Sequence, residues 1–197
     1  KLSVDEVDVL RRRIAGGLHA AHLLGIVHRD ISPDNIILPS ARVERAKIID
    51  FGIARSTQVG EGTVIGSGFA GKYNYVSPEQ LGLEGGDVTG RSDIYSLGLV
   101  LAEALTGRAI DMGGTQVQLI DKRRRVPDLA GIDPSYRPLL NAMLAPDPNK
   151  RPADMAAVAS WQRAAPAAAR RGGGALRWVA VAAGLVALVG GGYGVWT

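Results

Sequence analysis

The 197-residue sequence contains no cysteine, and aromatic residues make up only 5% of it. Without cysteine there is no disulfide framework, no thiolate metal site and no cysteine nucleophile. Three histidines with no cysteine also argue against a zinc site. The first residues, from Lys1 to Asp5, carry no apolar stretch of the kind that a signal peptide needs. The lack of cysteine suits a protein of a reducing compartment.

The net charge of the chain is small, and its basic residues are clustered. The formal net charge is +4, and basic residues gather at 11–13, at 122–125 and at 170–177. We expect the first two runs to be solvated helix faces, and the third adjoins an apolar run. No nucleic-acid partner is expected. At 46% hydrophobic residues, the chain can bury one ordinary core.

The first half of the chain predicts one helix, a small hairpin and a long loop. Ser3 with Glu6 three residues later is a capping box that opens the helix, and Gly25 ends it. Apolar residues at helical spacing predict one buried face, formed by Val7, Leu10, Ile14, Leu18 and Ala21. Residues 36–38 and 48–49 predict the two strands of the hairpin. Residues 52–74, rich in Gly, Ser and Thr, predict a functional loop.

The second half is predicted to be helical. Residues 93–106 are apolar nearly all round and stop at Gly107, which is typical of a helix buried on most sides. Shorter helices are expected near 115–124, 135–145 and 153–163. The fold class is therefore α+β, mainly α-helical with one small β element.

Five short motifs carry the functional prediction. They are HRDISPDN at 28–35, DFG at 50–52, SPE at 77–79, Asp93 and Arg151. In order and spacing they resemble the signature of eukaryotic-like (Hanks-type) bacterial serine/threonine protein kinases. The resemblance covers residues 1–163 and implies the α-helical C-terminal lobe of a kinase catalytic domain.

The resemblance also implies roles for individual residues. Asp30 would orient the substrate hydroxyl and accept its proton, as phosphoryl transfer requires. Asn35 and Asp50 would supply oxygen ligands to Mg²⁺, so that the implied cofactors are ATP and Mg²⁺. A lone Asp or Asn is more often a turn or capping residue, and the prediction depends on all three together.

Other matching residues are architectural or regulatory. Glu79 and Arg151 resemble a buried ion pair, and Asp93 resembles the residue that braces the catalytic-loop backbone. His28 is interpreted as a packed core histidine. Arg29 resembles the arginine that clamps a phosphorylated loop. The phosphorylation candidates in that loop, which could equally be ordinary loop hydroxyls, are Ser56, Thr57, Thr63 and Ser67.

Two positions depart from the family pattern. Ser32 stands where the family usually has a lysine two residues after the catalytic Asp, and Lys72 follows Gly71 where the family usually has a threonine. One hypothesis is a reciprocal swap, in which Lys72 brings the ammonium to the phosphate and Ser32 takes over the hydroxyl's hydrogen bond. The alternative is independent drift in a weakened or inactive kinase.

The sequence has no glycine-rich phosphate loop and no strand lysine ahead of these motifs. Gly66 to Gly71 imitates such a loop but follows the DFG triplet, so it is discarded. The chain is expected to be a fragment that lacks the N-terminal lobe, or else a remnant that holds ATP poorly. The first helix and the hairpin should then expose apolar surface.

Residues 164–177 predict an Ala-, Pro-, Arg- and Gly-rich linker, and residues 178–196 predict a transmembrane helix. The 19-residue run has no charge and is bounded by tryptophans, which suits a bilayer of about 30 Å. Arg170, Arg171 and Arg177 precede it, so the kinase domain is expected on the cytoplasmic side of the cell membrane.

The leading prediction is a membrane-anchored protein serine/threonine kinase that signals by phosphorylating protein substrates, with this stretch alone inactive and a homodimer possible. The alternative is a pseudokinase, a scaffold or binding module without turnover. A small-molecule phosphotransferase is disfavoured by the SPE segment, which shapes a peptide platform.

Overall fold

The computed structural model describes residues 1–51, 72–83 and 85–163. The described residues lie within one compact unit, Lys1–Pro166. The linker at 164–177, the apolar run at 178–196 and the four candidate phosphorylation residues all lie outside the described residues. Within the described ranges, no helix is both long and apolar enough to cross a bilayer.

The first helix, α1 (Val4–Leu23), begins as the sequence predicts. Glu6 N donates to Ser3 Oγ at 3.3 Å, and Ser3 N donates to a Glu6 carboxylate oxygen at 2.8 Å. The buried apolar face consists of Val7, Leu10, Ile14, Ala15 and Leu18. Ala21, which the spacing also predicts on this face, is only partly buried. Just past the helix, Gly25 has a φ of 74°, a left-handed conformation that reverses the chain at little cost for glycine.

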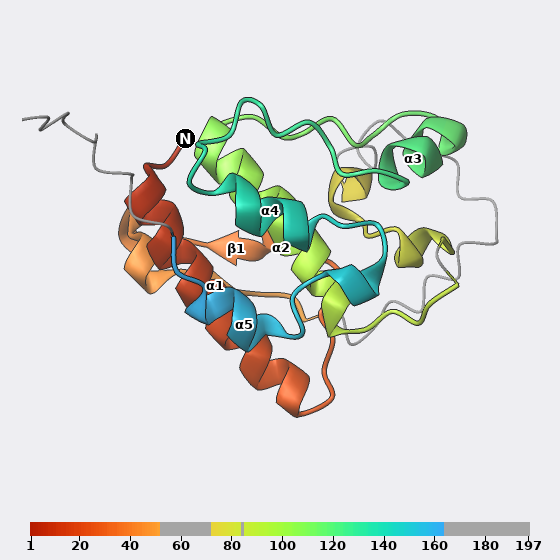
Figure 1. Ribbon diagram of the computed structural model, residues 1–197. Helices are drawn as coiled ribbons and strands as arrows, with labels where there is room; N and C mark the ends of the chain where they lie inside the picture. Colours follow the sequence, from red (N-terminus) through yellow and green to blue (C-terminus); the bar gives the residue numbers. More distant parts are fainter. Residues whose placement is uncertain (52–71, 84, 164–197) are drawn as a thin grey trace, which may run out of the picture. The chain divides into compact units, whose positions relative to one another are not determined.

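The hairpin is present but short. Strands β1 (Ile36–Ile37) and β2 (Lys47–Ile48) pair antiparallel, with Ile36 opposite Ile48. The two strands lie against α1, with β2 in contact with the helix (Figure 1). Residues 72–74, expected to end the loop, instead belong to a 3₁₀ helix, Lys72–Tyr75.

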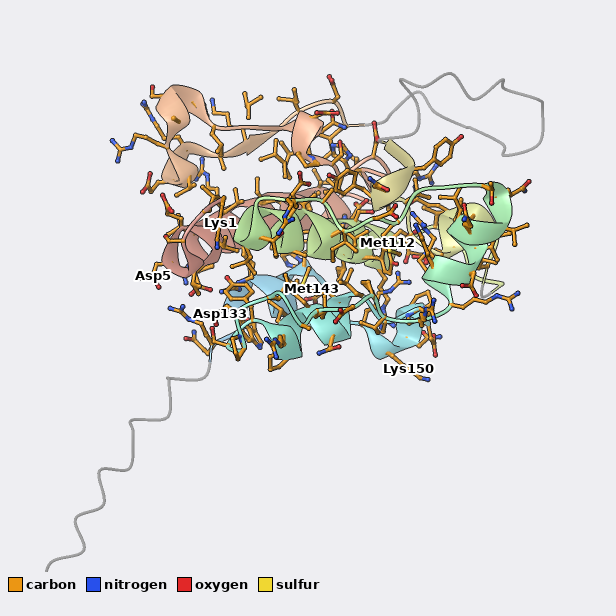
Figure 2. All side chains as sticks on the ribbon, turned by 90° about the horizontal axis from the view of Figure 1, so that it is seen from above. Lys1, Asp5, Met112, Asp133, Met143 and Lys150 are labelled. Atoms are coloured by element: carbon orange, nitrogen blue, oxygen red, sulfur yellow. The ribbon has the colours of Figure 1, made fainter. Side chains whose placement is uncertain are left out.

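Helix α2 (Gly90–Thr106) is the centre of the core. Twelve of its residues are buried, which fits its nearly uniform apolar sequence. In Figure 2, α2 lies between the hairpin on one side and the segment with Met143 on the other. A Cβ on Gly98 would come within 2.9 Å of Leu144 Cδ2, so only glycine permits this close approach.

Three shorter helices complete the described unit, and each falls within its predicted range. They are α3 (Gln116–Arg123), α4 (Arg137–Met143) and α5 (Met155–Ser160). Helix α5 packs along α1, and α4 packs on α2 (Figure 1). The prediction of a mainly helical α+β fold is confirmed.

The prediction that both basic runs are solvated is wrong at two positions. Arg11 and Arg123 are 1% and 0% exposed. Arg11 donates to the carbonyl oxygens of Val158, Ala159 and Trp161 at the end of α5. These carbonyls lack partners inside a helix that ends at Ser160, and a guanidinium carries enough donors to satisfy several of them.

Apolar surface is exposed where the sequence leads us to expect it. Leu23 and Leu24 at the end of α1 are 74% and 78% exposed, and Ile37 on β1 is 41% exposed. Isolated exposed leucines are ordinary, but two consecutive ones at a helix end form a small apolar patch.

Candidate active site

Asp93, in the first turn of α2, holds the backbone of the loop that carries Asp30. Its Oδ1 accepts from Arg29 N at 2.8 Å, and its Oδ2 accepts from His28 N at 2.9 Å. The carboxylate is 1% exposed and lies at a helix N-terminus, where a negative charge is favoured. Asp93 therefore braces the loop backbone directly.

Sequence reasoning missed a third partner of Asp93. His22 Nε2 lies 2.8 Å from Asp93 Oδ2, so the last turn of α1 and the first turn of α2 meet at this carboxylate. A Cβ on Gly90 would lie 2.6 Å from His22 Nδ1, which requires glycine at the start of α2. The available signal was the position of His22, four residues after the buried Leu18 on the same helix.

His28 joins the loop to the strand that precedes Asp50. The ring is fully buried, and its Nδ1 accepts from Asp30 N at 3.3 Å. Its Nε2 lies 3.0 Å from the carbonyl oxygen of Ile49, so Nε2 carries the proton. The imidazole also packs against Phe51, with ring centroids 4.9 Å apart. The structure thus places His28 as a buried link between the two predicted catalytic segments.

Asp30 and Asn35 are brought together. Asn35 Nδ2 donates to the Asp30 carbonyl oxygen at 2.6 Å and to Asp30 Oδ2 at 3.2 Å. Both contacts need an N–H donor, so the amide nitrogen of Asn35 faces Asp30. The amide oxygen is therefore left for other partners. Asn35 is 5% exposed, so its orientation is fixed by packing as well as by hydrogen bonds.

Asp50 reaches this region through the backbone. Ile49 N donates to the carbonyl oxygen of Asn35 at 3.0 Å, and Asp50 follows directly. Asp50 has a φ of 56° and Arg29 a φ of 67°, a left-handed conformation that is uncommon for residues other than glycine. Strained backbone at both positions is typical of functional sites.

The donor set around Asn35 and Asp50 fits Mg²⁺. This ion prefers oxygen ligands and is usually held by one or two protein groups together with substrate phosphates. Among the described residues there is no cluster of three or more His, Cys, Asp or Glu that would hold a metal without a substrate. The side-chain oxygens of Asn35 and Asp50 are ligands of the kind that this ion prefers.

Ser32, two residues after Asp30, is 1% exposed. Its Oγ has no hydrogen-bond partner among the described residues. A buried hydroxyl without a partner carries a desolvation cost of about 1–3 kcal/mol. The backbone of Lys72 begins the 3₁₀ helix Lys72–Tyr75, but its side chain lies outside the described part of the chain.

The segment Ser77–Gln80 contacts the loop of Asp30 through a residue that sequence reasoning did not single out. Gln80 Nε2 donates to the carbonyl oxygen of Arg29 at 2.7 Å, while its Oε1 accepts from Ser77 N and Oγ. Tyr75 donates its hydroxyl to Glu103 on α2. Burial and this neighbouring carboxylate raise the pKa of the Tyr75 hydroxyl. Arg29 itself is exposed.

Glu79 and Arg151 form a fully buried ion pair. The two side chains are 0% exposed, and Arg151 Nη1 and Nη2 donate to the two Glu79 carboxylate oxygens at 2.7 and 2.9 Å. Arg151 also donates to the carbonyl oxygens of Arg91, Ala145 and Pro146. Burial alone would raise the pKa of Glu79, but the hydrogen bonds and charge of Arg151 outweigh it and hold the pKa below its usual value.

Comparison with known proteins agrees with this geometry. The family model described as "Protein kinase domain" matches residues 1–161. The chain is 45% identical over 96 residues to the serine/threonine-protein kinase PknD of Mycobacterium tuberculosis, covering 49% of this chain and 14% of that protein. It is 33% identical over 158 residues to PknL of the same organism, covering 77% of this chain and 38% of that protein.

A solved structure described as Rad53 1-466 in complex with AMP-PNP is also similar. The match has a TM-score of 0.63 and 27% sequence identity, and covers 81% of this chain and 40% of that one. The chain thus spans well under half the length of these relatives.

Proposed function

Because the chain belongs to the protein kinase domain family, we propose that the protein transfers the γ-phosphate of ATP to serine and threonine hydroxyls of protein substrates. The observation that carries this proposal is the hydrogen-bonded pair of Asp30 and Asn35 on a loop whose backbone is held by Asp93. Two serine/threonine kinases of Mycobacterium tuberculosis among the similar proteins support the residue specificity.

In this proposal the chain's own residues orient the reactants. Asp30 accepts the proton of the attacking hydroxyl, and its hydrogen bond to Asn35 restricts the orientation of the carboxylate. His28 connects Asp30 to Ile49, so the loop of Asp30 is tied by hydrogen bonds to the residue before Asp50.

The oxygens of Asn35 and Asp50 would hold Mg²⁺ with the ATP phosphates, and the bound ion would supply charge neutralisation at the phosphates. This assignment is supported by the orientation of Asn35, whose amide nitrogen is used by Asp30.

The test is phosphate transfer by the full-length protein in which Asp30 or Asp50 is replaced. Asp30→Asn and Asp50→Asn should each lower kcat at least a hundredfold, because each removes a group that acts on the transition state. Asp121→Asn, an exposed residue on α3, is the control and should match the unaltered protein. Unchanged transfer by Asp30→Asn would refute the proposal.

A pseudokinase remains the second candidate, and Ser32 is the observation that favours it. A buried hydroxyl without a described partner stands where related kinases usually present a lysine. If this candidate is right, the full-length protein binds ATP in a calorimetric titration but transfers no phosphate, with or without the substitutions at Asp30 and Asp50.

We also propose that Ser32 and Lys72 have exchanged roles. The unpartnered Ser32 hydroxyl supports this, since a buried donor requires a partner that a substrate or a neighbouring segment can supply. Lys72→Met should then abolish transfer while leaving the unfolding free energy unchanged. The double variant Ser32→Lys/Lys72→Thr should recover part of the activity. A double variant no better than Lys72→Met would count against the exchange.

Anchoring in the cell membrane is a further part of the proposal, and it is supported by the uncharged run at 178–196 with Arg170, Arg171 and Arg177 ahead of it. The full-length protein should sediment with membranes, and a form lacking 178–196 should not. Protease added to intact cells should leave the kinase domain uncut if that domain is cytoplasmic.

We also propose that Arg29 clamps a phosphorylated loop, and the exposure of Arg29 beside Asp30 supports this. Mass spectrometry after incubation with ATP should find phosphate on Ser56, Thr57, Thr63 or Ser67. An unmodified loop in an active protein would refute this part alone.

A further inference from the structure

Arg123, the last residue of α3, is a buried cation held by backbone carbonyls. Its side chain is 0% exposed. Nε donates to the carbonyl oxygen of Val76 at 2.8 Å, and Nη1 donates to that of Met112 at 2.6 Å. Nη2 donates to the carbonyl oxygen of Tyr73, and Nη1 has a weaker contact with Leu119 in its own helix.

The arrangement is unusual in its charge balance. Among the described residues Arg123 takes part in no ion pair, and the hydrogen-bond acceptors of its guanidinium there are carbonyl oxygens. Burial accordingly lowers the pKa of the Arg123 guanidinium. An apolar side chain of similar size would avoid the desolvation cost of the guanidinium, but it would leave the carbonyl oxygens of Tyr73, Val76 and Met112 without this donor. The role of Arg123 therefore lies in where it holds these carbonyls.

The carbonyls that Arg123 binds belong to two different parts of the chain. Tyr73 and Val76 lie in the segment that leads into Ser77–Gln80, whereas Met112 lies on the connection between α2 and α3 (Figure 2). A second tie runs parallel, since Met112 N donates to Asn74 Oδ1 at 3.2 Å. Through these hydrogen bonds, Arg123 links residues 73–76 to the connection between α2 and α3, which is far from them in the sequence.

The other end of this segment is fastened to the loop of Asp30. Gln80 donates to the carbonyl oxygen of Arg29, next to Asp30 in sequence. Residues 73–80 are therefore held between Arg123 at one end and the Arg29 carbonyl at the other. A five-donor guanidinium with a rigid planar geometry specifies where three carbonyls lie, which an apolar residue cannot do.

We propose that Arg123 is a positioning residue that sets the segment 73–80 relative to Asp30, and thereby the surface on which a protein substrate docks. This inference rests on the proposed kinase function. It makes Arg123 act through the backbone of the segment and not through any contact with substrate, because the guanidinium is fully buried.

The first test compares steady-state kinetics of the full-length protein with myelin basic protein as the probe substrate. Arg123→Met should raise KM for this substrate about tenfold while leaving KM for ATP within about twofold, because only the docking segment is displaced. Arg123→Lys keeps the charge but loses the planar fork, so its KM should be intermediate. Lys122→Met, the neighbouring half-buried cation, should leave both constants unchanged.

The second test needs no catalysis. Hydrogen exchange of the amides of residues 73–80 should be faster in Arg123→Met than in the unaltered protein, with exchange in α1 and α2 unchanged. Faster exchange across α1 and α2 as well would mean that Arg123 supports the whole fold, and would overturn the proposal. Equal increases in KM for ATP and for the protein substrate would also overturn the proposal.

The two tests also separate this inference from the proposed function. If the unaltered protein transfers no phosphate, the kinase proposal fails, while the exchange experiment still decides whether Arg123 positions residues 73–80. If transfer is normal and neither KM nor exchange changes in Arg123→Met, only the role of Arg123 is refuted.

Discussion

Asp93 shows how a single residue determines the geometry of the candidate site. One carboxylate accepts two backbone N–H groups and lies 2.8 Å from a histidine ring nitrogen, so α1, α2 and the loop of Asp30 meet at it. These contacts compensate for burying the charge. They also explain how Arg29 is kept in a left-handed conformation, which is costly for a residue other than glycine.

Tyr95 gives a sharp prediction at this scale. Its hydroxyl is buried and has no partner among the described residues, and burial raises its pKa to about 12. Tyr95→Phe should therefore leave the unfolding free energy unchanged or raise it by up to about 1 kcal/mol. The matched control is Tyr136→Phe, which loses a 2.6 Å hydrogen bond to Asp8 and should cost about 1–2 kcal/mol in urea unfolding. Equal losses in the two variants would contradict this account.

The lowered pKa of Glu79 predicts how the stability of the protein falls in acid. Because its folded-state pKa lies below the ordinary value of 4.5, its contribution is fully present above that pH and is lost as the pH falls through the lowered pKa. Glu79→Gln leaves Arg151 buried without a counter-charge and should cost about 3–5 kcal/mol at pH 7. Its unfolding free energy should also fall less steeply between about pH 5 and pH 3. Glu44→Gln, at an exposed position, should reproduce the parent curve.

At the scale of elements, two arginines join α1 to α5 and the residues just after it: Arg11, which is buried, and Arg163, which is partly exposed. Arg11 satisfies carbonyls at the end of α5 and lies 5.4 Å from the centre of the Trp161 ring, whereas Arg163 pairs with an Asp5 side chain that is 87% exposed. Arg11→Met should cost about 2–4 kcal/mol, because several carbonyls are left buried without donors. Arg163→Met should cost less than about 1 kcal/mol. Similar losses of unfolding free energy in the two variants, measured by urea unfolding, would show that burial does not determine how much each arginine stabilises the protein.

The helices and the hairpin were predictable from local signals, but the long-range contacts were not. The capping box at Ser3 and the apolar run that ends at Gly107 locate helix ends because these signals lie within a few residues. The motifs predict Asp30, Asn35 and Asp50 as site residues, and the structure brings Asp30 and Asn35 into contact. The burial of Arg123 and the link between Gln80 and Arg29 depend on residues that are about 50 positions apart, and no periodicity in the sequence encodes such a pairing.

At the scale of the whole molecule, the apolar patch of Leu23 and Leu24 predicts self-association. Both side chains are more than 70% exposed at the end of α1. Leu23→Gln/Leu24→Gln should reduce concentration-dependent light scattering, while the midpoint of thermal unfolding shifts by no more than about 2 °C, because neither side chain belongs to the core. As a control, Val117→Gln removes a comparably exposed side chain on α3, outside the patch, and should change scattering little.

The ion pair between Asp5 and Arg163 has a mechanical consequence. It joins the first turn of α1 to the residues just after α5. Residues 5 and 163 therefore lie on the same side of this unit. Pulling on both ends would separate α5 from α1 one contact after another, beginning at the Asp5–Arg163 pair. It would not slide the two helices past each other in a single step. A tether that pulls on this unit would therefore open it at low force, starting from the side opposite the loop of Asp30.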